Sequence, residues 1–138
     1  MTASLLCVNQ LTITSAQADS LVDNVSLTLD SGEWLALVGE SGSGKSLTAL
    51  SCLNLLPAGL NSSGQIVWRG ENISTFPAQR LRQLRGGDIG MVYQEPLTAL
   101  NPLHRIGKQL IEANTPHQAI SPAQAKKRAL TLLAEEGL

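Results

Sequence analysis

The chain has 138 residues and a mass of 14.6 kDa, with 43% hydrophobic and 15% charged residues. This is the composition of a compact globular protein rather than of a disordered or fibrous one, and the length is sufficient for a single buried core. Ten basic and eleven acidic side chains give a formal net charge of −1, which excludes the strongly basic balance of a dedicated nucleic-acid-binding protein. Any anionic ligand must therefore be held by a local site.

The cysteine pattern and the hydropathy exclude two further classes. Cys7 and Cys52 form no CxxC pair, so we expect two buried thiols rather than a disulfide framework or a zinc site. No apolar run reaches the length of roughly eighteen residues that a membrane span needs, and residues 1–6 do not resemble a signal peptide. We expect a cytoplasmic protein without a membrane span.

Three segments of the N-terminal third have the pattern of strands. Residues 5–14 are rich in Leu, Val, Ile and Thr, and residues 25–29 alternate strictly between apolar and polar side chains. After a turn at residues 30–33, residues 34–38 form an uninterrupted apolar run. This run predicts a strand buried on both faces of a parallel sheet, and Trp34, like Trp68, is expected in the core.

The remaining elements alternate between helices and short strands. Residues 45–56 predict a largely buried helix that Pro57 ends, residues 65–68 and 89–93 predict short strands, and residues 77–85 predict a short polar helix that Gly86 and Gly87 end. The last helix begins at Ser121 with a capping box completed by Gln124, and Gly137 is its expected C-cap residue. Its apolar face has only one turn-connected neighbour in this sequence, residues 106–113, so we expect that the packing partner of this face is missing from the chain. The order of elements predicts an α/β fold.

A phosphate-binding motif follows the predicted buried strand directly. Residues 39–46 read Gly-Glu-Ser-Gly-Ser-Gly-Lys-Ser, a complete GxxxxGK[ST]. A polyphosphate needs backbone N–H groups in a concave loop, which glycines permit by their dihedral freedom and small size. Lys45 opens the following helix, whose N-terminal positive charge adds to that of its ammonium at the β- and γ-phosphates. Ser46 supplies a hard oxygen for Mg²⁺.

We therefore predict a nucleotide-binding loop in which Lys45 is also a catalytic residue. The predicted contacts are Gly39, Glu40, Ser41, Gly42, Ser43, Gly44, Lys45, Ser46 and Leu47. A glycine-rich turn that binds nothing is the alternative, but a chance match occurs in only on the order of one in a few hundred chains of this length. The loop alone does not choose among ATPases, GTPases and small-molecule kinases.

The rest of the chain resembles the ATP-binding subunits of ABC transporters. Residues 27–46 look like the Walker A region of that family, and residues 90–96, Gly-Met-Val-Tyr-Gln-Glu-Pro, look like its Q-loop. Residues 97–102, Leu-Thr-Ala-Leu-Asn-Pro, are similar to the subfamily that imports oligopeptides, dipeptides and nickel.

This resemblance implies a truncated α/β fold, with a P-loop NTPase (RecA-like) core, an antiparallel β subdomain and the start of a helical subdomain. Residues 1–94 would form the core with the β subdomain, and residues 95–138 the Q-loop and the start of the helical subdomain. ATP and Mg²⁺ are the implied ligands, with Gln94 as a second catalytic residue and, with Ser46, a metal ligand. The implied partners are transmembrane permease subunits and a second ATP-binding subunit or domain, at the inner face of the cell membrane. No nucleic acid is expected as a partner.

Two departures from the family pattern modify the expected function. Residues 13–15, Ile-Thr-Ser, stand where the family usually has an aromatic residue that stacks on adenine. The chain also ends at Leu138, before the family's signature motif, Walker B aspartate, catalytic glutamate, D-loop and switch histidine. We therefore expect the ATP-binding component of an importer of peptides or a related small solute, which by itself binds ATP without turnover.

Two alternatives stay open at this stage. One is a stand-alone truncated nucleotide-binding module without transport activity. The other is a small P-loop kinase or GTPase, which is disfavoured because nothing in the sequence resembles a substrate lid or a guanine-reading motif.

Overall fold

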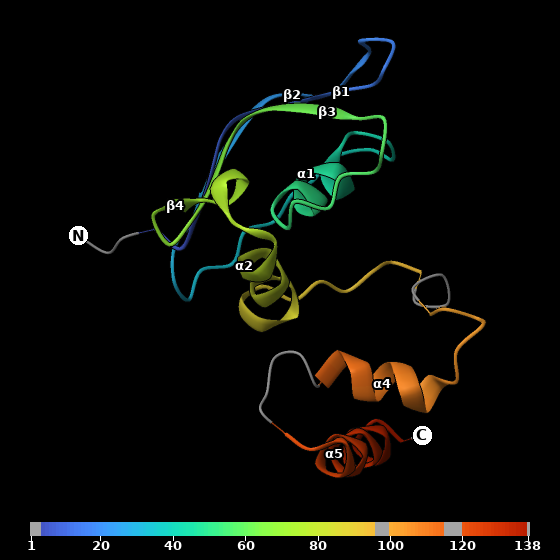
Figure 1. The fold of residues 1–138 in the computed structure, drawn as a ribbon. Helices are drawn as coiled ribbons and strands as arrows, with labels where there is room; N and C mark the ends of the chain where they lie inside the picture. Colours follow the sequence, from blue (N-terminus) through green and yellow to red (C-terminus); the bar gives the residue numbers. More distant parts are fainter. Residues whose placement is uncertain (1–3, 96–99, 115–119, 138) are drawn as a thin grey trace. The chain divides into compact units, whose positions relative to one another are not determined.

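The computed structural model describes residues 4–95, 100–114 and 120–137 (Figure 1) and divides into two compact units, Met1–Leu81 and Arg82–Leu138. The first unit contains strands β1 (Leu6–Thr14), β2 (Ser20–Leu29), β3 (Asn61–Trp68) and β4 (Glu71–Asn72), helix α1 (Lys45–Ser51) and the 3₁₀ turn η1 (Ile73–Thr75). Helix α2 (Ala78–Gln83) crosses the boundary. The second unit contains the π-turn η2 (Leu84–Asp88) and helices α4 (Ile106–Asn114) and α5 (Pro122–Glu135).

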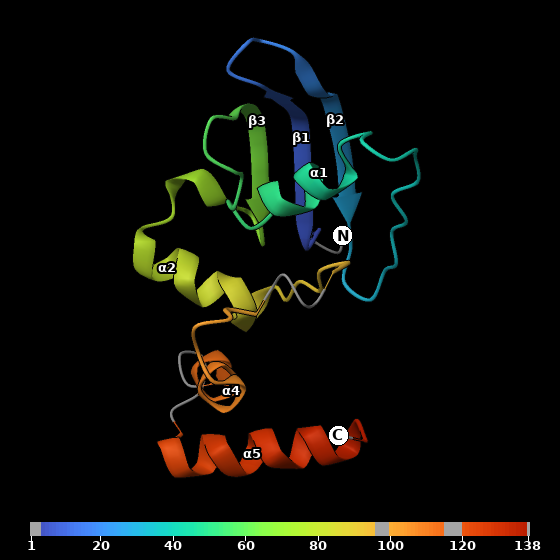
Figure 2. The same ribbon diagram turned by 90° about the vertical axis from the view of Figure 1, so that its right-hand side faces the viewer.

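The first unit is built on an antiparallel sheet with the strand order β2-β1-β3-β4. Helix α1 lies against one face of this sheet, as the two views in Figures 1 and 2 show. The prediction of β1 is confirmed, and β2 and β3 exist as predicted but begin earlier, at Ser20 and Asn61. The buried apolar side chains of this unit are Val8, Leu11, Ile13, Val22, Leu53, Ile66, Trp68, Ile73 and Phe76.

Strand β1 carries one extra residue, so its buried positions do not alternate strictly. Its pairing with β3 is regular up to Asn9↔Gln65 and resumes at Thr12↔Ser63. The bulged residue Gln10 has a φ of 50°, and the bulge reverses the direction of every later side chain. This explains why Val8, Leu11 and Ile13 are all buried although Leu11 follows Val8 by three positions, an odd number that would put them on opposite faces of a regular strand.

Strand β2 contains a second bulge, and at each bulge a side-chain hydroxyl accepts a hydrogen bond from a backbone amide. The N–H of Gln10 donates to Ser26 Oγ at 2.9 Å, and the N–H of Asn24, whose φ is 48°, donates to Thr12 Oγ1 at 3.1 Å. Each strand thus supplies a hydroxyl for the amide that the other strand's ladder leaves unpaired.

Gly64 on β3 faces the β1 bulge at close range. Its φ is +97°, and a Cβ at this position would lie 2.5 Å from the carbonyl oxygen of Gln10 and 2.6 Å from that of Asn9. Both facts require glycine here, because the left-handed conformation disfavours a side chain and the carbonyls leave no room for one.

Two predicted strands are wrong. Residues 34–38 form no strand, and Trp34 and Val38 are 97% and 93% exposed. Trp34 is therefore not a core residue. Trp68 is buried, as predicted. Residues 89–93 contain only an isolated bridge between Arg85 and Ile89. A central parallel strand needs hydrogen-bonded neighbours on both sides, and within the described ranges no strand pairs with either segment.

Helix α1 is shorter than predicted. It ends at Ser51 rather than at residue 56, because tight-turn hydrogen bonds follow it, from Leu53 N–H to Leu50 O and from Asn54 N–H to Ser51 O. Asn54 has a φ of 51°, which a continuing helix does not allow.

The helices of the second unit largely agree with prediction. Helix α5 has the predicted capping box between Ser121 and Gln124, and Gly137 follows its C-cap residue with a φ of 79°. Ala125 and Ala129 are buried and α5 contacts α4, but Leu132 on the same face is 44% exposed. Along the parts of the chain that the structure covers, no helix combines the length and apolar character needed to cross a bilayer.

Candidate nucleotide-binding loop

The predicted phosphate loop is accessible and is braced by strand β2. Residues 39–43 are exposed, and Gly44 is the N-cap residue of α1 with a φ of 85°. A Cβ on Gly44 would lie 2.6 Å from Val22 Cγ2 and 2.7 Å from Leu21 O. The end of the loop therefore rests on β2, a contact that the sequence did not predict because the motif does not say which element lies behind it.

The ammonium of Lys45 lies inside the curve of the loop. Its Nζ donates to the carbonyl oxygens of Gly39 at 2.7 Å and Glu40 at 2.6 Å, and to Ser43 Oγ at 3.1 Å. The N–H of Ser43 donates to Glu40 O at 3.2 Å and closes the turn. An ammonium has three N–H groups, and in this arrangement the loop offers an acceptor for each of them.

Thr48 anchors the first turn of α1 and was missed by the sequence reasoning. It is 5% exposed, and both its N–H and its hydroxyl donate to Gly44 O, at 2.9 and 3.0 Å. A threonine four residues after the capping glycine is the signal that could have found it, since such hydroxyls bond to the carbonyl one turn earlier. Thr48 fixes the residue that precedes Lys45.

The loop fits a polyphosphate by its own geometry. The ammonium is already held among residues 39–43, and Gly44 provides no side-chain cap for the amides of the first turn. A Cβ on Gly42 would meet no atom of the described structure within 4 Å, so the loop is open on this side. Free amides, an ammonium and open access are the features that anion binding requires.

The other predicted site residues are placed as follows. Ser46 is exposed and Leu47 half-buried in the first turn of α1. Gln94 lies in the second unit, exposed and outside any helix or strand, since the strand predicted directly before it, at residues 89–93, does not form. Its roles in catalysis and metal binding stay predictions. Ile13, at the position of the missing adenine platform, is fully buried in the sheet and offers no surface for stacking.

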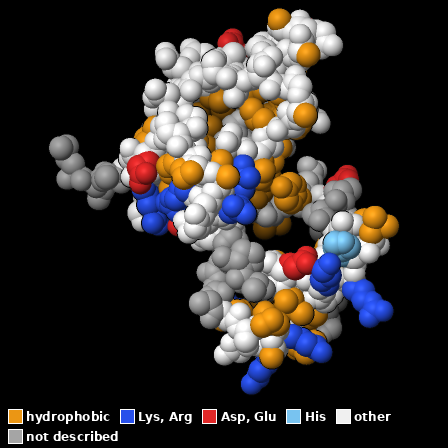
Figure 3. All heavy atoms as spheres, in the orientation of Figure 1, with side chains coloured by type: hydrophobic (Ala, Val, Ile, Leu, Met, Phe, Trp, Pro, Cys, Tyr) orange, Lys and Arg blue, Asp and Glu red, His pale blue; other side chains and the backbone are white. Residues whose placement is uncertain are grey.

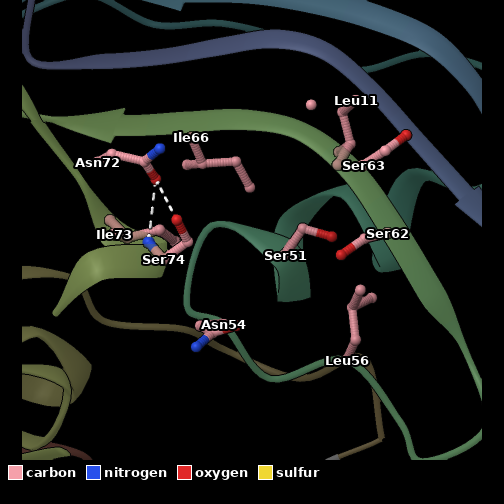
Figure 4. Close-up of a pocket in the computed structure, with 11 residues that line it drawn as sticks. Leu11, Ser51, Asn54, Leu56, Ser62, Ser63, Ile66, Asn72, Ile73 and Ser74 are labelled. Carbon is pink, nitrogen blue, oxygen red and sulfur yellow. Dashed lines mark hydrogen bonds between the residues drawn. The ribbon is translucent and has the colours of Figure 1, made fainter. Parts of the chain in front are cut away.

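A pocket elsewhere in the first unit is not the nucleotide site. It has a volume of about 70 Å³ and lies between the end of α1, β3 and η1 (Figure 4). Ser51 and Ser62 point toward each other across it, and Asn72 Oδ1 accepts hydrogen bonds from the N–H and hydroxyl of Ser74. Nucleotide sites are several times larger, and no residue of the predicted loop lines this pocket.

A glycine-rich loop that encloses a lysine ammonium and leads into a helix packed on a sheet defines a P-loop nucleotide-binding protein. The sequence pattern of the ABC transporter family matches residues 22–138. The chain belongs to this family, which confirms the α/β class and implies a P-loop NTPase fold that binds ATP.

Curated relatives of the chain are named as transport ATP-binding proteins. The chain is 48% identical over 142 residues to the peptidoglycan transport ATP-binding protein YejF of Agrobacterium fabrum, covering 99% of this chain and 26% of the relative. It is 47% identical over 116 residues to the probable D,D-dipeptide transport ATP-binding protein DdpD of Escherichia coli, covering 83% and 35%. It is 41% identical over 119 residues to the oligopeptide transport ATP-binding protein OppD of Bacillus subtilis, covering 85% and 33%. The chain thus spans about a quarter to a third of the length of these relatives.

Proposed function

We propose that this chain is the N-terminal part of the ATP-binding component of an ABC transporter that imports peptides or a related small solute. The observation that carries the proposal is the position of the Lys45 ammonium within the loop of residues 39–43. The names of the relatives support the substrate class, since each concerns transport of peptidoglycan, D,D-dipeptides or oligopeptides.

In the proposed site the loop residues exchange internal partners for phosphate oxygens. Lys45 releases the carbonyls of Gly39 and Glu40 and directs its ammonium at the β- and γ-phosphates of ATP. Backbone amides along residues 39–47 hold further phosphate oxygens, and the start of α1 adds its partial positive charge. Ser46 and Gln94 are the residues that would hold Mg²⁺, and the ion would neutralise charge on the phosphates.

In this proposal, residues 1–138 alone are not sufficient for ATP turnover or for transport. Residues 1–138 contain no signature motif, Walker B aspartate or catalytic glutamate, and phosphoryl transfer to water needs a residue that positions the nucleophile and a completed charge clamp. The segment alone therefore binds ATP without hydrolysing it. The proposed partners are permease subunits and a second ATP-binding subunit or domain, at the inner face of the cell membrane. Residues 1–94 form the proposed core with its β subdomain, and residues 95–138 the Q-loop and the start of the helical subdomain.

Titration with ATP in the presence and absence of Mg²⁺ tests the proposal. Lys45→Ala should weaken binding by more than about tenfold, because it removes the only side-chain cation of the loop. Lys108→Ala is the matched control: it removes a lysine whose ammonium lies 3.6 Å from Glu112 on the surface of α4, and its affinity should equal that of the wild type. Equal affinities for wild type and Lys45→Ala would overturn the assignment of the loop.

A further inference from the structure

The carbonyl oxygen of Gly44 accepts two hydrogen bonds from a single residue, Thr48. The N–H of Thr48 donates to it at 2.9 Å, as in any α-helix, and the Thr48 hydroxyl donates to it at 3.0 Å. Thr48 is 5% exposed, so water does not readily replace its hydroxyl at this oxygen. The oxygen of Gly44 is therefore held from the side of α1 by two donors rather than by one.

Gly44 depends on such contacts because glycine has the least restricted backbone of any residue. Its φ of +85° lies in the left-handed region. Strand β2 limits the residue from behind, since a Cβ would lie 2.7 Å from Leu21 O and 2.6 Å from Val22 Cγ2. These contacts restrict the Cα of Gly44, whereas the two hydrogen bonds from Thr48 restrict the plane of its carbonyl.

The orientation of the Gly44 carbonyl decides where the N–H of Lys45 points. In a planar trans peptide, the C=O of one residue and the N–H of the next point in opposite directions, and the peptide between Gly44 and Lys45 is trans. Lys45 is the first residue of α1, so its N–H has no acceptor within the helix. Because Thr48 holds Gly44 O toward the helix, the N–H of Lys45 is directed away from the helix, at the end where the loop of residues 39–43 lies.

We propose that Thr48 is a positioning residue for phosphate binding, in which its buried hydroxyl aims the backbone N–H of Lys45 at the bound phosphate. This rests on the proposed function, in which ATP binds at residues 39–47. Thr48 does not touch the phosphate, since its hydroxyl acts through Gly44 O. Lys45 then contributes two donors that are fixed in different ways: the loop holds its ammonium, and Thr48 sets the direction of its amide.

Ser51 provides a matched control in the same helix. It is 4% exposed, and its hydroxyl donates to Leu47 O at 2.8 Å, which is the same type of bond one turn further along α1. The N–H that follows the Leu47 carbonyl is that of Thr48, and it already donates to Gly44 O. The loss of either hydroxyl removes a buried hydrogen bond from α1, but only the loss at Thr48 releases the amide of Lys45.

Titration of residues 1–138 with ATP tests the role of Thr48. Thr48→Val replaces the hydroxyl by a methyl group and should weaken ATP binding by about fivefold, the equivalent of one hydrogen bond, whereas Thr48→Ser keeps the hydroxyl and should bind like the wild type. Ser51→Ala should also bind like the wild type, although urea unfolding should show that it destabilises the chain about as much as Thr48→Val does. Lys and Arg side chains lie at the surface of the second unit as well (Figure 3), so the titrations are run at about 0.15 M salt, which screens their attraction for ATP.

The amide resonance of Lys45 gives a readout that a purely structural role would not change. Saturating ATP should move this amide proton downfield in the wild type and in Thr48→Ser, and move it less in Thr48→Val. Wild-type affinity or a wild-type shift in Thr48→Val would overturn the positioning role. Equal weakening in Ser51→Ala and Thr48→Val would also overturn it, because affinity would then follow the stability of the helix. A wild-type chain that binds no ATP would refute the proposed function itself, whereas the other outcomes refute only the role of Thr48.

Discussion

The ammonium of Lys45 lies 2.6 Å from the carbonyl oxygen of Glu40. With Gly39 O and Ser43 Oγ, this oxygen holds the lysine ammonium within the loop. The charge that is proposed to bind phosphate therefore also shapes the loop before phosphate arrives. Such preorganisation lowers the entropic cost of binding, although the carbonyl contacts must be given up in exchange.

The first prediction concerns the contact between Gly39 and Ser43. A Cβ on Gly39 would lie 2.6 Å from Ser43 Oγ, so in Gly39→Ala the Ser43 hydroxyl should rotate away and lose its contact with Lys45 Nζ, which should weaken ATP binding by about threefold. In the double variant Gly39→Ala/Ser43→Gly there is no hydroxyl to displace, so its affinity should equal that of Ser43→Gly alone. A double variant that binds more weakly than Ser43→Gly would show that the clash is not the cause.

The second prediction compares two glycines with positive φ, Gly64, which has no space for a side chain, and Gly70, which has. Gly64→Ala should destabilise the chain by ~3 kcal/mol or more, because it combines a left-handed φ with backbone oxygens closer than 3 Å to the new Cβ. Gly70 has a φ of +84° but no atom within 4 Å of its Cβ position, so Gly70→Ala should cost only ~1 kcal/mol. Urea unfolding measures both, and equal losses would contradict the close approach of Gly64 to β1.

The third prediction follows from the contrast between the two tryptophans. Trp34 is 97% exposed and Trp68 is 5% exposed. In residues 1–138, Trp34→Phe should therefore leave a blue-shifted emission that iodide hardly quenches, whereas the wild type should contain a second, red-shifted component that iodide quenches readily. If Trp34→Phe leaves the quenched fraction unchanged, residues 34–38 are not exposed in solution.

The fourth prediction concerns the pH dependence of Cys52. Burial raises the pKa of the Cys52 thiol above its ordinary value, because it disfavours the thiolate. In a Cys7→Ser background, alkylation by iodoacetamide should be slower in the folded chain than in urea. The stability contributed by the neutral thiol is present below the pKa of the unfolded chain and is lost as pH rises through the folded value. Cys52→Ala should remove this loss, and a loss that persists would place its origin elsewhere.

The features that the sequence predicted correctly are those fixed by neighbouring residues. The capping box of Ser121 and Gln124 and the start of α1 at Lys45 depend on short spacings that are read directly. The predicted strand at residues 34–38 failed because an apolar run does not specify its hydrogen-bonding partners. Two contacts follow no recognised spacing in the sequence. Val22 lies behind Gly44 because the fold brings β2 to the loop, and Gln109 reaches Asn101 across a turn.

The bulges at Gln10 and Asn24 shift the pairing of β1 and β2 in opposite directions, so that the register of Ile13↔Val22 equals that of Val8↔Leu27. An added residue in one strand is thus cancelled by an added residue in the other. In terms of insertions and deletions, this hairpin should accept changes in pairs, one residue in each strand, whereas a single deletion would turn the inner side chains of one strand outward.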